Sequence, residues 1–545
     1  MRRRFHLVVM LVAGMAACAR AHVDPSLADG DSRAIAKEGN AGAGGNENED
    51  EGAGSGAAGE GTTSASDVAR ATSGAAAGAD AGAPADGPTL YAFAVQAPIF
   101  SASEWPPKDP GKADEERRGV VRLGYLRKGE HVPVKPGMIA KSNCAEGWFE
   151  LAPPSTGFVC GKFATTDEHH KELKLAPHVP YMDRDLPYEY GLNLTPGTPL
   201  YRRIPLKSER RDNEKTLAIG KGHKSSDIAK KLQENGEAVP AYLKDTGAAK
   251  PSVRFDDLKG ESDLVAVHML KGFYLALDRK VDARSGLFWH TASGFMAPKD
   301  HLIVHEPKTE FEGIDLTSPT ETRKLPLAFV VGTRARTCEL DLANKDVKRG
   351  DKIERFSILS LTGKHEAIAD RVYYETDKGF WVRDFDVAVV SLPKVPSDIV
   401  KDERWVDVDL SSQALVAFEG DKAVYATIVS TGRHNAEPEK DHRTAEGSFR
   451  IREKHVSVTM DDDGASDGTY RIEDVPWVMY FEKSLALHGA FWHSSFGREK
   501  SHGCVNLTPH DARHIFGWAG PQLPDGWHGV KATKENPGTR VIVHK

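Results

Sequence analysis

The stretch Ser501-His502-Gly503-Cys504-Val505-Asn506 decides the fold and the chemistry that we expect of this chain. His488 lies sixteen positions before Cys504, and His493 and His502 lie between them. A cysteine attacks as its thiolate, and because a free thiol has a pKa of about 8.5 it needs a group that takes its proton. Histidine is a common base for this task. The stretch therefore predicts a cysteine nucleophile that is activated by a histidine.

The residues around Cys504 predict a tight turn followed by a helix. Gly503 allows the backbone to turn sharply or to approach a substrate closely. Thr508, Pro509 and Asp511 are residue types that cap and begin a helix, and we expect this helix to end near Trp518. The dipole of a helix favours a thiolate that lies near the helix N-terminus.

Two motifs give the C-terminal part of the chain a family resemblance. His488-Gly489 followed by residues 501–506 resembles the signature of the YkuD-type L,D-transpeptidases, and the resemblance extends over residues 404–545. Residues 444–449 resemble the family's Thr-Pro-x-Gly-x-Phe segment, with Ala445 in place of proline. Many members have arginine where this chain has Asn506. The resemblance implies a β-sandwich whose active site lies in a cleft beside the cysteine-bearing loop.

The resemblance also implies a role for each motif residue. Cys504 is expected to be the nucleophile and His488 the proton acceptor and donor, with the Gly489 carbonyl oxygen orienting its ring. Backbone N–H groups around Gly503 and Cys504 are expected to form the oxyanion hole. The residues expected to contact the substrate are Trp492, His493, Ser501, His502 and Asn506.

The implied reaction is acyl transfer in two steps on bacterial peptidoglycan. The thiolate attacks the carbonyl after the L-centre of the third residue in a tetrapeptide stem, and the terminal D-Ala leaves. An amine from a neighbouring stem then resolves the thioester and forms a 3→3 cross-link. The expected partners are peptidoglycan stem peptides, no cofactor is expected, and we expect a monomer.

Other interpretations stay open at this stage. A lone cysteine is usually a buried apolar residue, and a lone histidine is usually structural. His493 competes with His488 for the role of base because it is also close to Cys504 in the sequence. If water resolves the thioester, the chain is an L,D-carboxypeptidase or an enzyme that releases wall-linked protein. A further hypothesis is a lipoprotein that mainly binds the cell wall.

Composition and spacing argue against nucleic acids and metal ions. The net charge is −7, and no nucleic-acid-binding motif is present. The acidic run of residues 461–463 with Asp467 lacks the spacing and the terminal glutamate of a calcium loop. His488, His493 and His502 do not have the spacing of a zinc site. We therefore expect no metal.

The N-terminal residues 1–18 have the pattern of an export signal. Residues 1–4 are Met-Arg-Arg-Arg, and residues 7–17 form an apolar run that is too short to span a membrane as a mature helix. Residues 15–18, Met-Ala-Ala-Cys, resemble a bacterial lipobox, which implies cleavage before Cys18 and lipidation of its thiol. The alternative is an ordinary signal peptide. We expect an exported lipoprotein, anchored in a membrane and facing the periplasm or the cell wall.

The composition divides the exported part into a tether and a series of mainly β domains. Residues 19–88 are rich in Gly, Ala, Ser, Glu and Asp, and they contain too few large apolar residues to fold alone, so we expect a disordered linker. Short Gly-punctuated strands predict an SH3-like β module over residues 89–170 and another over 331–400, with a middle β-rich region and polar insertion over 171–330. Residues 401–545 form the expected catalytic domain.

The five cysteines fit an oxidising compartment. Cys144 and Cys160 lie sixteen positions apart in one compact β-rich stretch, and we expect a disulfide between them. With Cys18 assigned to lipid and Cys504 to catalysis, Cys338 remains as a free thiol.

Overall fold

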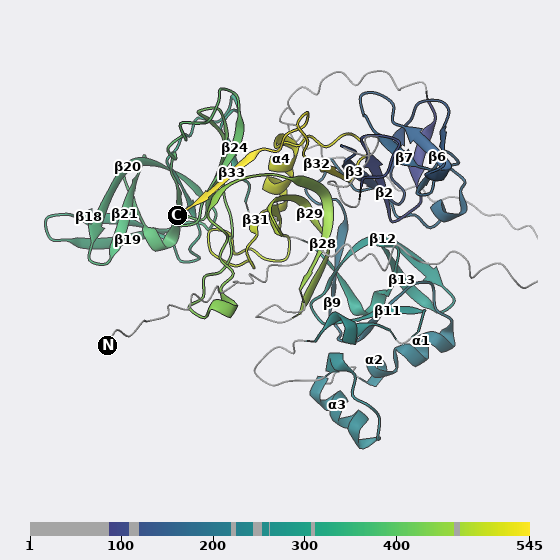
Figure 1. Cartoon of the computed structure of the whole chain (residues 1–545). Helices are drawn as coiled ribbons and strands as arrows, with labels where there is room; N and C mark the ends of the chain where they lie inside the picture. Colours follow the sequence, from purple (N-terminus) through teal and green to yellow (C-terminus); the bar gives the residue numbers. More distant parts are fainter. Residues whose placement is uncertain are drawn as a thin grey trace, which may run out of the picture. The chain divides into compact units, whose positions relative to one another are not determined.

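The computed structural model describes residues 87–107, 119–219, 225–243, 253–260, 262–306, 311–462 and 469–545 (Figure 1). The predicted signal segment, the predicted lipidation site Cys18 and nearly all of the predicted linker lie outside these residues, as do Asp463 and Asp467 of the acidic run. The described part is mainly β, which confirms the predicted fold class. Within it, no helix is both long enough and apolar enough to cross a membrane.

The first module is built from short antiparallel strands. They are β1 (Thr89–Ala92), β2 (Gln96–Phe100), β3 (Arg122–Arg127), β4 (His131–Pro133), β5 (Ile139–Lys141), β6 (Cys144–Glu150), β7 (Phe158–Cys160) and β8 (Ala164–Thr165). β1 pairs with β4 and β8, while β2 pairs with β3 and β7. Their alternating apolar residues enclose a core that includes Leu90, Ile99 and Leu126.

A disulfide joins the two paired strands β6 and β7 of this module. It links Cys144 to Cys160 with a Cα–Cα distance of 6.1 Å, and it is the pair that the sequence predicts. Trp148, which is fully buried, stands opposite Cys160 in the β6–β7 register. Cys338 is buried and is not in a disulfide, and burial raises the pKa of its thiol.

The middle region is a second β unit with a helical insertion. Its strands are β9 (Glu189–Asn193), β10 (Thr198–Tyr201), β11 (Val265–Met269), β12 (Tyr274–Ala283), β13 (Gly286–Thr291), β14 (Met296–Pro298) and β15 (Leu302–His305). The polar insertion contains α1 (Lys207–Asn213), α2 (Lys215–Ile219) and α3 (Ser225–Glu234).

The third module forms a seven-stranded antiparallel sheet. Its strands are β17 (Leu327–Val330), β18 (Arg336–Asp341), β19 (Asp346–Lys352), β20 (Ile358–Ile368), β21 (Arg371–Thr376), β22 (Trp381–Arg383) and β23 (Val387–Val390). The predicted boundary after residue 330 is wrong, because β17 pairs with both β20 and β23 and belongs to this sheet. The strand β16 (Ile314–Asp315) also differs from the prediction. It lies in the predicted middle region, but it pairs with β26 (Lys422–Ile428) of the predicted catalytic domain.

The catalytic domain consists of two sheets with a helix against one of them. The first sheet has the order β16-β26-β25-β24-β33-β27 and contains β24 (Arg404–Asp409), β25 (Ala414–Glu419), β26 (Lys422–Ile428), β27 (Gly447–Arg450) and β33 (Arg540–His544). In this sheet β25 and β26 form a hairpin, in which Glu419 pairs with Lys422. The second group contains β28 (Glu453–Asp462), β29 (Tyr470–Glu482), β30 (Leu485–Gly489), β31 (Val505–Leu507) and β32 (Gly529–Lys531).

Helix α4 (Pro509–Trp518) is confirmed where the sequence predicts it. The Thr508 hydroxyl caps its N-terminus by accepting a hydrogen bond from the Asp511 N–H at 3.1 Å. The helix packs against β29 and β30, and a single core cluster joins its residues Ala512, Ile515 and Phe516 to both sheets. Because α4 begins shortly after β31, its packing fixes the position of the strand that directly follows Cys504.

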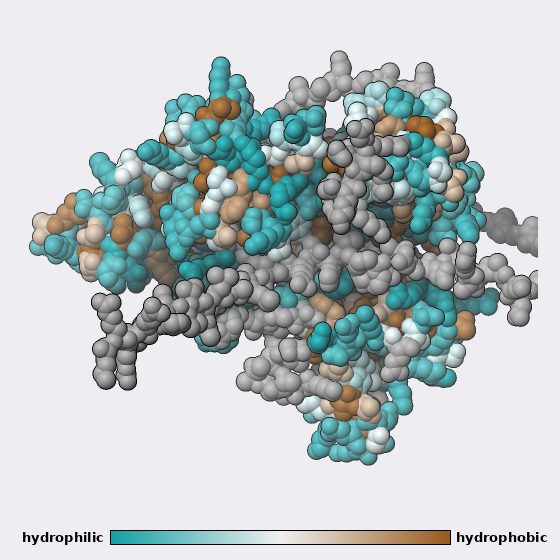
Figure 2. All heavy atoms as spheres, viewed as in Figure 1, coloured by the Kyte–Doolittle hydropathy of each residue, from teal (hydrophilic) through white to brown (hydrophobic). Residues whose placement is uncertain are grey.

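Strand pairing and buried polar contacts attach the first two modules to the catalytic domain. β3 pairs with β32, and Tyr274 of β12 pairs with Ile472 of β29. The Arg127 guanidinium forms an ion pair with the Asp474 carboxylate, which is almost fully buried. The face of the molecule shown in Figure 2 is mainly hydrophilic, with hydrophobic residues scattered over it.

We predict that replacing both Cys144 and Cys160 by serine lowers the stability of the first module. The bond closes a loop of sixteen residues, and closing a loop of that size contributes about 3 kcal/mol in the chain-entropy model. Thermal unfolding of wild type and the double variant measures this loss, and Cys338→Ser serves as the control. Equal melting temperatures for wild type and the double variant would show that the bond does not stabilise the module.

Candidate active site

The parallel pair β30–β31 brings His488 and Cys504 to the same face. Leu487 pairs with Val505 and His488 with Asn506, so Cys504, which directly precedes β31, lies beside Ala486. Successive side chains of a strand alternate between its two faces. Leu487 and Val505 accordingly pack in the core beneath α4. Ala486 and Cys504 contact a different cluster on the opposite face, and His488 shares that face by alternation.

His488 is neutral, and its Nε2 has a lone pair. Its Nδ1 lies 3.1 Å from the Gly489 carbonyl oxygen. Because a carbonyl only accepts, Nδ1 carries the ring hydrogen and Nε2 does not. Burial lowers the pKa of His488 to about 4, and the Gly489 carbonyl acts in the opposite direction. The ring also lies against Trp492, with 5.8 Å between centroids. His488 thus has the protonation state and tautomer of a general base.

His493 uses both of its ring nitrogens in hydrogen bonds to the protein. Its Nδ1 accepts from the Ser495 N–H at 3.1 Å, so the hydrogen of the neutral ring is on Nε2. The structure places the amide nitrogen Nδ2 of Asn506 2.9 Å from this Nε2. Two donors would meet there if the amide nitrogen faced the ring, so we assign the side-chain oxygen of Asn506 to this contact. His493 therefore has no lone pair to offer Cys504.

The two histidines lie close together but have opposite tautomers. Burial, together with the neighbouring His488 and Lys500, lowers the pKa of His493 to about 4. His488 presents an acceptor nitrogen, whereas His493 presents only a hydrogen that Asn506 accepts. This difference in proton placement favours His488 over His493 as the base, which sequence spacing alone left open.

The loop before Cys504 closes on the hydroxyl of Ser501. This hydroxyl donates to the Cys504 carbonyl oxygen at 2.5 Å and accepts from the Gly503 N–H at 3.1 Å. The sequence assigned the Gly503 N–H to an oxyanion hole, but here the loop uses it internally. Ser501 and Asn506, predicted to contact substrate, are both buried and bond to the protein.

Thr444 supports the same loop from the segment that carries the second family motif. Its hydroxyl donates to the Gly503 carbonyl oxygen at 2.8 Å and accepts from the Gly432 N–H at 3.0 Å. Gly503 has a φ of +123°, which favours glycine, and a Cβ on Gly432 would lie 2.8 Å from the Gly503 Cα. No role was predicted for Thr444, although the motif of residues 444–449 that contains it was a signal for one.

Cys504 is partly exposed, and its Sγ lies 3.7 Å from the carbonyl oxygen of Ser484. His502 lies on the exposed side of the loop. Its ring stacks on Tyr470 with 5.3 Å between centroids, and its Nε2 is 3.3 Å from Nη2 of Arg433. Tyr470 and Arg433 were not singled out from the sequence, since both are far from the motif in the chain.

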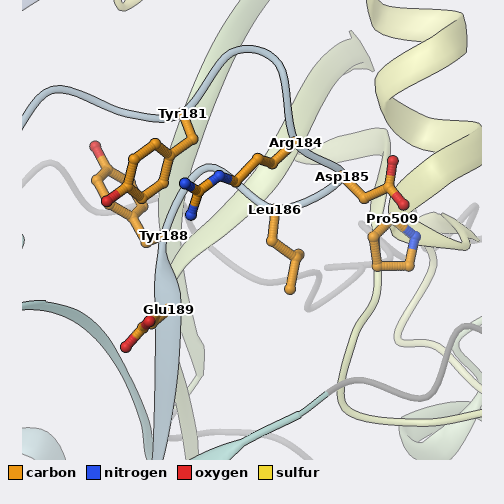
Figure 3. A pocket seen from close by; sticks show the side chains of 7 residues that line it. All are labelled: Tyr181, Arg184, Asp185, Leu186, Tyr188, Glu189 and Pro509. Atoms are coloured by element: carbon orange, nitrogen blue, oxygen red, sulfur yellow. The ribbon is translucent and has the colours of Figure 1, made fainter. Parts of the chain in front are cut away.

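A separate pocket lies beside the N-terminus of α4 (Figure 3). Arg184 covers the ring of Tyr181 at 3.7 Å from its centroid, and Pro509 closes the side next to the helix. None of the predicted catalytic residues lines this pocket. Within the described residues, the single close group of three possible metal ligands is Cys144, Glu146 and Cys160, and its two sulfurs are bonded to each other.

Comparisons with known proteins identify the C-terminal segment. Residues 403–543 match the family model YkuD, the L,D-transpeptidase catalytic domain. A relative from Bacillus subtilis (strain 168) that carries the name L,D-transpeptidase YciB is 25% identical over 135 residues, which is 22% of this chain and 62% of that protein. The chain thus spans less than two thirds of that relative. The C-terminal part carries a YkuD-type L,D-transpeptidase catalytic domain, as the resemblance predicted.

Two solved structures are similar to part of the chain. A cysteine-to-serine mutant of the Enterococcus faecium L,D-transpeptidase is 18% identical, with a TM-score of 0.21, over 29% of this chain and 55% of that one. L,D-transpeptidase 3 from Mycobacterium tuberculosis is 19% identical, with a TM-score of 0.21, over 34% of this chain and 79% of that one. These identities and TM-scores are too low to carry an argument about the function of this chain.

We predict that the pKa of His488 near 4 sets the acid limit of Cys504 reactivity. Its neutral ring is the base, so its contribution is present above that pKa and is lost as the pH falls through it. At pH 6 a thiol with an ordinary pKa of about 8.5 is almost entirely protonated. Alkylation of Cys504 by a neutral haloacetamide at pH 6, followed by mass spectrometry, should therefore be at least about tenfold slower in His488→Gln.

His493→Gln is the matched control because it removes the neighbouring ring and leaves His488 in place. Its alkylation at pH 6 should stay closer to wild type than to His488→Gln. The reverse order of the two variants would assign the base to His493.

Proposed function

We propose that this protein is a peptidoglycan L,D-transpeptidase that uses Cys504 as its nucleophile. The observation that carries this proposal is the β30–β31 register, which brings a neutral His488 with a free Nε2 lone pair to the face of Cys504. This pair lies within the segment that matches the L,D-transpeptidase catalytic domain. A purely structural histidine does not need a neutral ring with Nε2 unprotonated on the same strand face as a partly exposed thiol.

In the first step, His488 Nε2 takes the proton of the Cys504 thiol, and the sulfur attacks the carbonyl carbon of the third stem residue. The tetrahedral intermediate collapses as His488 returns the proton to the nitrogen of the terminal D-Ala. The bond between that nitrogen and the carbonyl carbon breaks, and a thioester forms on Cys504. In the second step, His488 takes a proton from the amine of another stem, and the amine nitrogen attacks the thioester carbon. The new C–N bond forms the cross-link, the C–S bond breaks, and His488 returns the proton to the Cys504 sulfur.

The surroundings of His488 suit a ring that becomes positive only during the reaction. Burial keeps it neutral at rest, because the charged form is poorly solvated there. When Nε2 takes a proton, the Gly489 carbonyl still accepts from Nδ1 and stabilises the imidazolium. The face of Trp492 beside the ring adds a cation–π contribution.

The predicted site residues divide into two groups in this proposal. Trp492 and His502 face the reaction and contact the stem peptide, with Tyr470 and Arg433 beside His502 on the rim. Ser501, His493 and Asn506 instead hold the backbone of the cysteine loop through buried hydrogen bonds. Because the Gly503 N–H is donated to Ser501, it serves as an oxyanion donor only if that bond opens in the acyl-enzyme.

The rival functions differ in what resolves the thioester. Water as acceptor gives an L,D-carboxypeptidase or an enzyme that releases wall-linked protein. A mainly wall-binding role for the SH3-like modules needs neither Cys504 nor His488. Incubation of purified protein with tetrapeptide muropeptides separates these functions, because cross-linked dimers indicate transpeptidation and tripeptides alone indicate hydrolysis.

We predict that Cys504→Ala abolishes both the acyl-enzyme and all muropeptide products, because no other described group replaces the thiolate. Intact-protein mass spectrometry after incubation with a carbapenem, and separately with tetrapeptide muropeptides, measures the adduct. Cys338→Ala is the matched control, since it removes a buried thiol outside the catalytic domain. An adduct of normal yield on Cys504→Ala would refute the assignment.

We also propose that the protein is exported and anchored through lipid on Cys18, as a monomer whose SH3-like modules face the wall. The lipobox-like residues 15–18 support this proposal. Cys18→Ser is expected to move the protein from the membrane fraction to the soluble exported fraction. A wild-type protein with a free N-terminus at Ala19 or His22 would contradict the lipid anchor.

A further inference from the structure

The connection between the two halves of the catalytic motif is held from two sides, by the residues that follow β26 in the catalytic domain and by parts of the chain outside that domain. We refer to residues 491–498, which follow His488 and precede Cys504, as the bridging segment. The His305 Nε2–H of β15 donates to the Phe491 carbonyl oxygen at 2.9 Å. From the third module, the Phe385 carbonyl oxygen accepts from Nη2 of Arg498 at 3.1 Å.

The third module, together with Phe311 from the residues before it, also provides apolar support for the bridging segment. Phe496 is buried with Phe311 and Phe356, and the rings of Phe311 and Phe496 meet edge to face at 5.5 Å between centroids. Gly497 has a φ of +81°, and a Cβ there would lie 2.3 Å from a methyl group of Val331. The segment therefore approaches the module too closely for any side chain at this position.

Arg355 makes the contact that leads directly to the active site. Its Nη2 donates to the Ser494 carbonyl oxygen at 2.7 Å, and its Nε donates to the Val331 carbonyl oxygen at 3.3 Å. The guanidinium also lies 4.1 Å from the centroid of the Phe356 ring. The same side chain thus links the backbone of its own module to that of the bridging segment.

The peptide group that Arg355 contacts also fixes the tautomer of His493. The carbonyl of Ser494 and the N–H of Ser495 belong to one peptide bond, and this N–H donates to Nδ1 of His493. A cation on the carbonyl oxygen polarises the peptide and strengthens donation by its N–H. His493 then has its hydrogen on Nε2 and holds Asn506, which pairs with His488 in the β30–β31 register.

The backbone beside Arg355 adopts a conformation that is costly for its residue type. Phe356 has a φ of +64°, in the left-handed region that residues other than glycine rarely adopt. Strain of this kind persists only where the surroundings impose it. Here it turns Phe356 toward the aromatic cluster while Arg355 reaches Ser494.

We propose that Arg355 is a positioning residue of the active site and that the third module is thereby part of the catalytic apparatus. This inference rests on the proposed function. Arg355 orders the Ser494–Ser495 peptide, which sets the tautomer of His493, and His493 in turn fixes Asn506 beside the catalytic pair. Arg355 itself does not contact the reacting atoms.

The test compares Arg355→Met, which removes the donors and keeps an unbranched stem, with Arg355→Lys, which retains a charged donor. Arg336→Met is the matched control, because Arg336 donates to the Gly350 carbonyl oxygen at 2.8 Å within the same module and does not contact the bridging segment. We expect Arg355→Met to lower kcat on tetrapeptide muropeptides by about tenfold or more, with KM changed less. Arg355→Lys should recover most of the loss, and Arg336→Met should match wild type.

The full-length protein with ¹⁵N-labelled histidine provides a second measurement that does not depend on activity. The imidazole nitrogen resonances of His493 should show an Nε2–H ring in wild type and Arg336→Met, and a mixture of tautomers in Arg355→Met. An unchanged tautomer in Arg355→Met, or a kcat within twofold of Arg336→Met, would overturn the proposal. If Arg355→Met does not fold, Arg355→Gln, which retains a neutral donor of shorter reach, is subject to the same criteria.

The two measurements also separate this inference from the proposed function. A wild-type protein that forms neither dimers nor tripeptides refutes the proposed function. The tautomer of His493 in the same sample still decides whether Arg355 orders the bridging segment.

Discussion

The parallel pairing of β30 with β31 is the constraint on which the rest of this structure depends. Antiparallel neighbours can be joined by a two-residue turn, but parallel neighbours need a crossover of a dozen or more residues, which is usually a helix. The crossover between Gly489 and Val505 contains neither a helix nor a named strand. A long connection without regular hydrogen bonds must obtain its order from its surroundings. The catalytic domain holds the later part of this connection, where the Val429 carbonyl oxygen accepts from the Gly497 N–H and the Thr431 carbonyl oxygen accepts from the N–H groups of Lys500 and Ser501. The earlier part also takes its order from the other modules.

This requirement gives the other modules a physical task. His305 comes from the middle region, and Arg355 comes from the third module, yet each donates to a carbonyl oxygen of the crossover. Within the catalytic domain, α4 begins shortly after β31 and packs against β30. The first module adds the buried ion pair between Arg127 and Asp474, which joins β3 to β29. These contacts indicate modules that pack against the catalytic domain rather than modules that are independent of it.

The sequence predicted local features well because each was encoded by neighbouring residues. Thr508, Pro509 and Asp511 specify the start of α4 within four positions, and Cys144 and Cys160 lie on adjacent strands of one small unit. It failed where the decisive partner was distant. β17 was assigned to the wrong region because its partners β20 and β23 lie well beyond it in the chain. Nothing near Arg355 indicates that it reaches Ser494, since the two are 139 positions apart.

Proton placement shows most clearly why spacing could not decide the roles of the two histidines. His488 and His493 are five positions apart, and burial lowers the pKa of both to about 4. What separates them is the backbone group at each Nδ1. A carbonyl oxygen there requires the hydrogen on Nδ1 and leaves a base at Nε2, whereas an N–H there requires the hydrogen on Nε2 and removes that base. Whether a carbonyl or an N–H faces the ring depends on the path of the crossover, and that path depends on the modules that hold it.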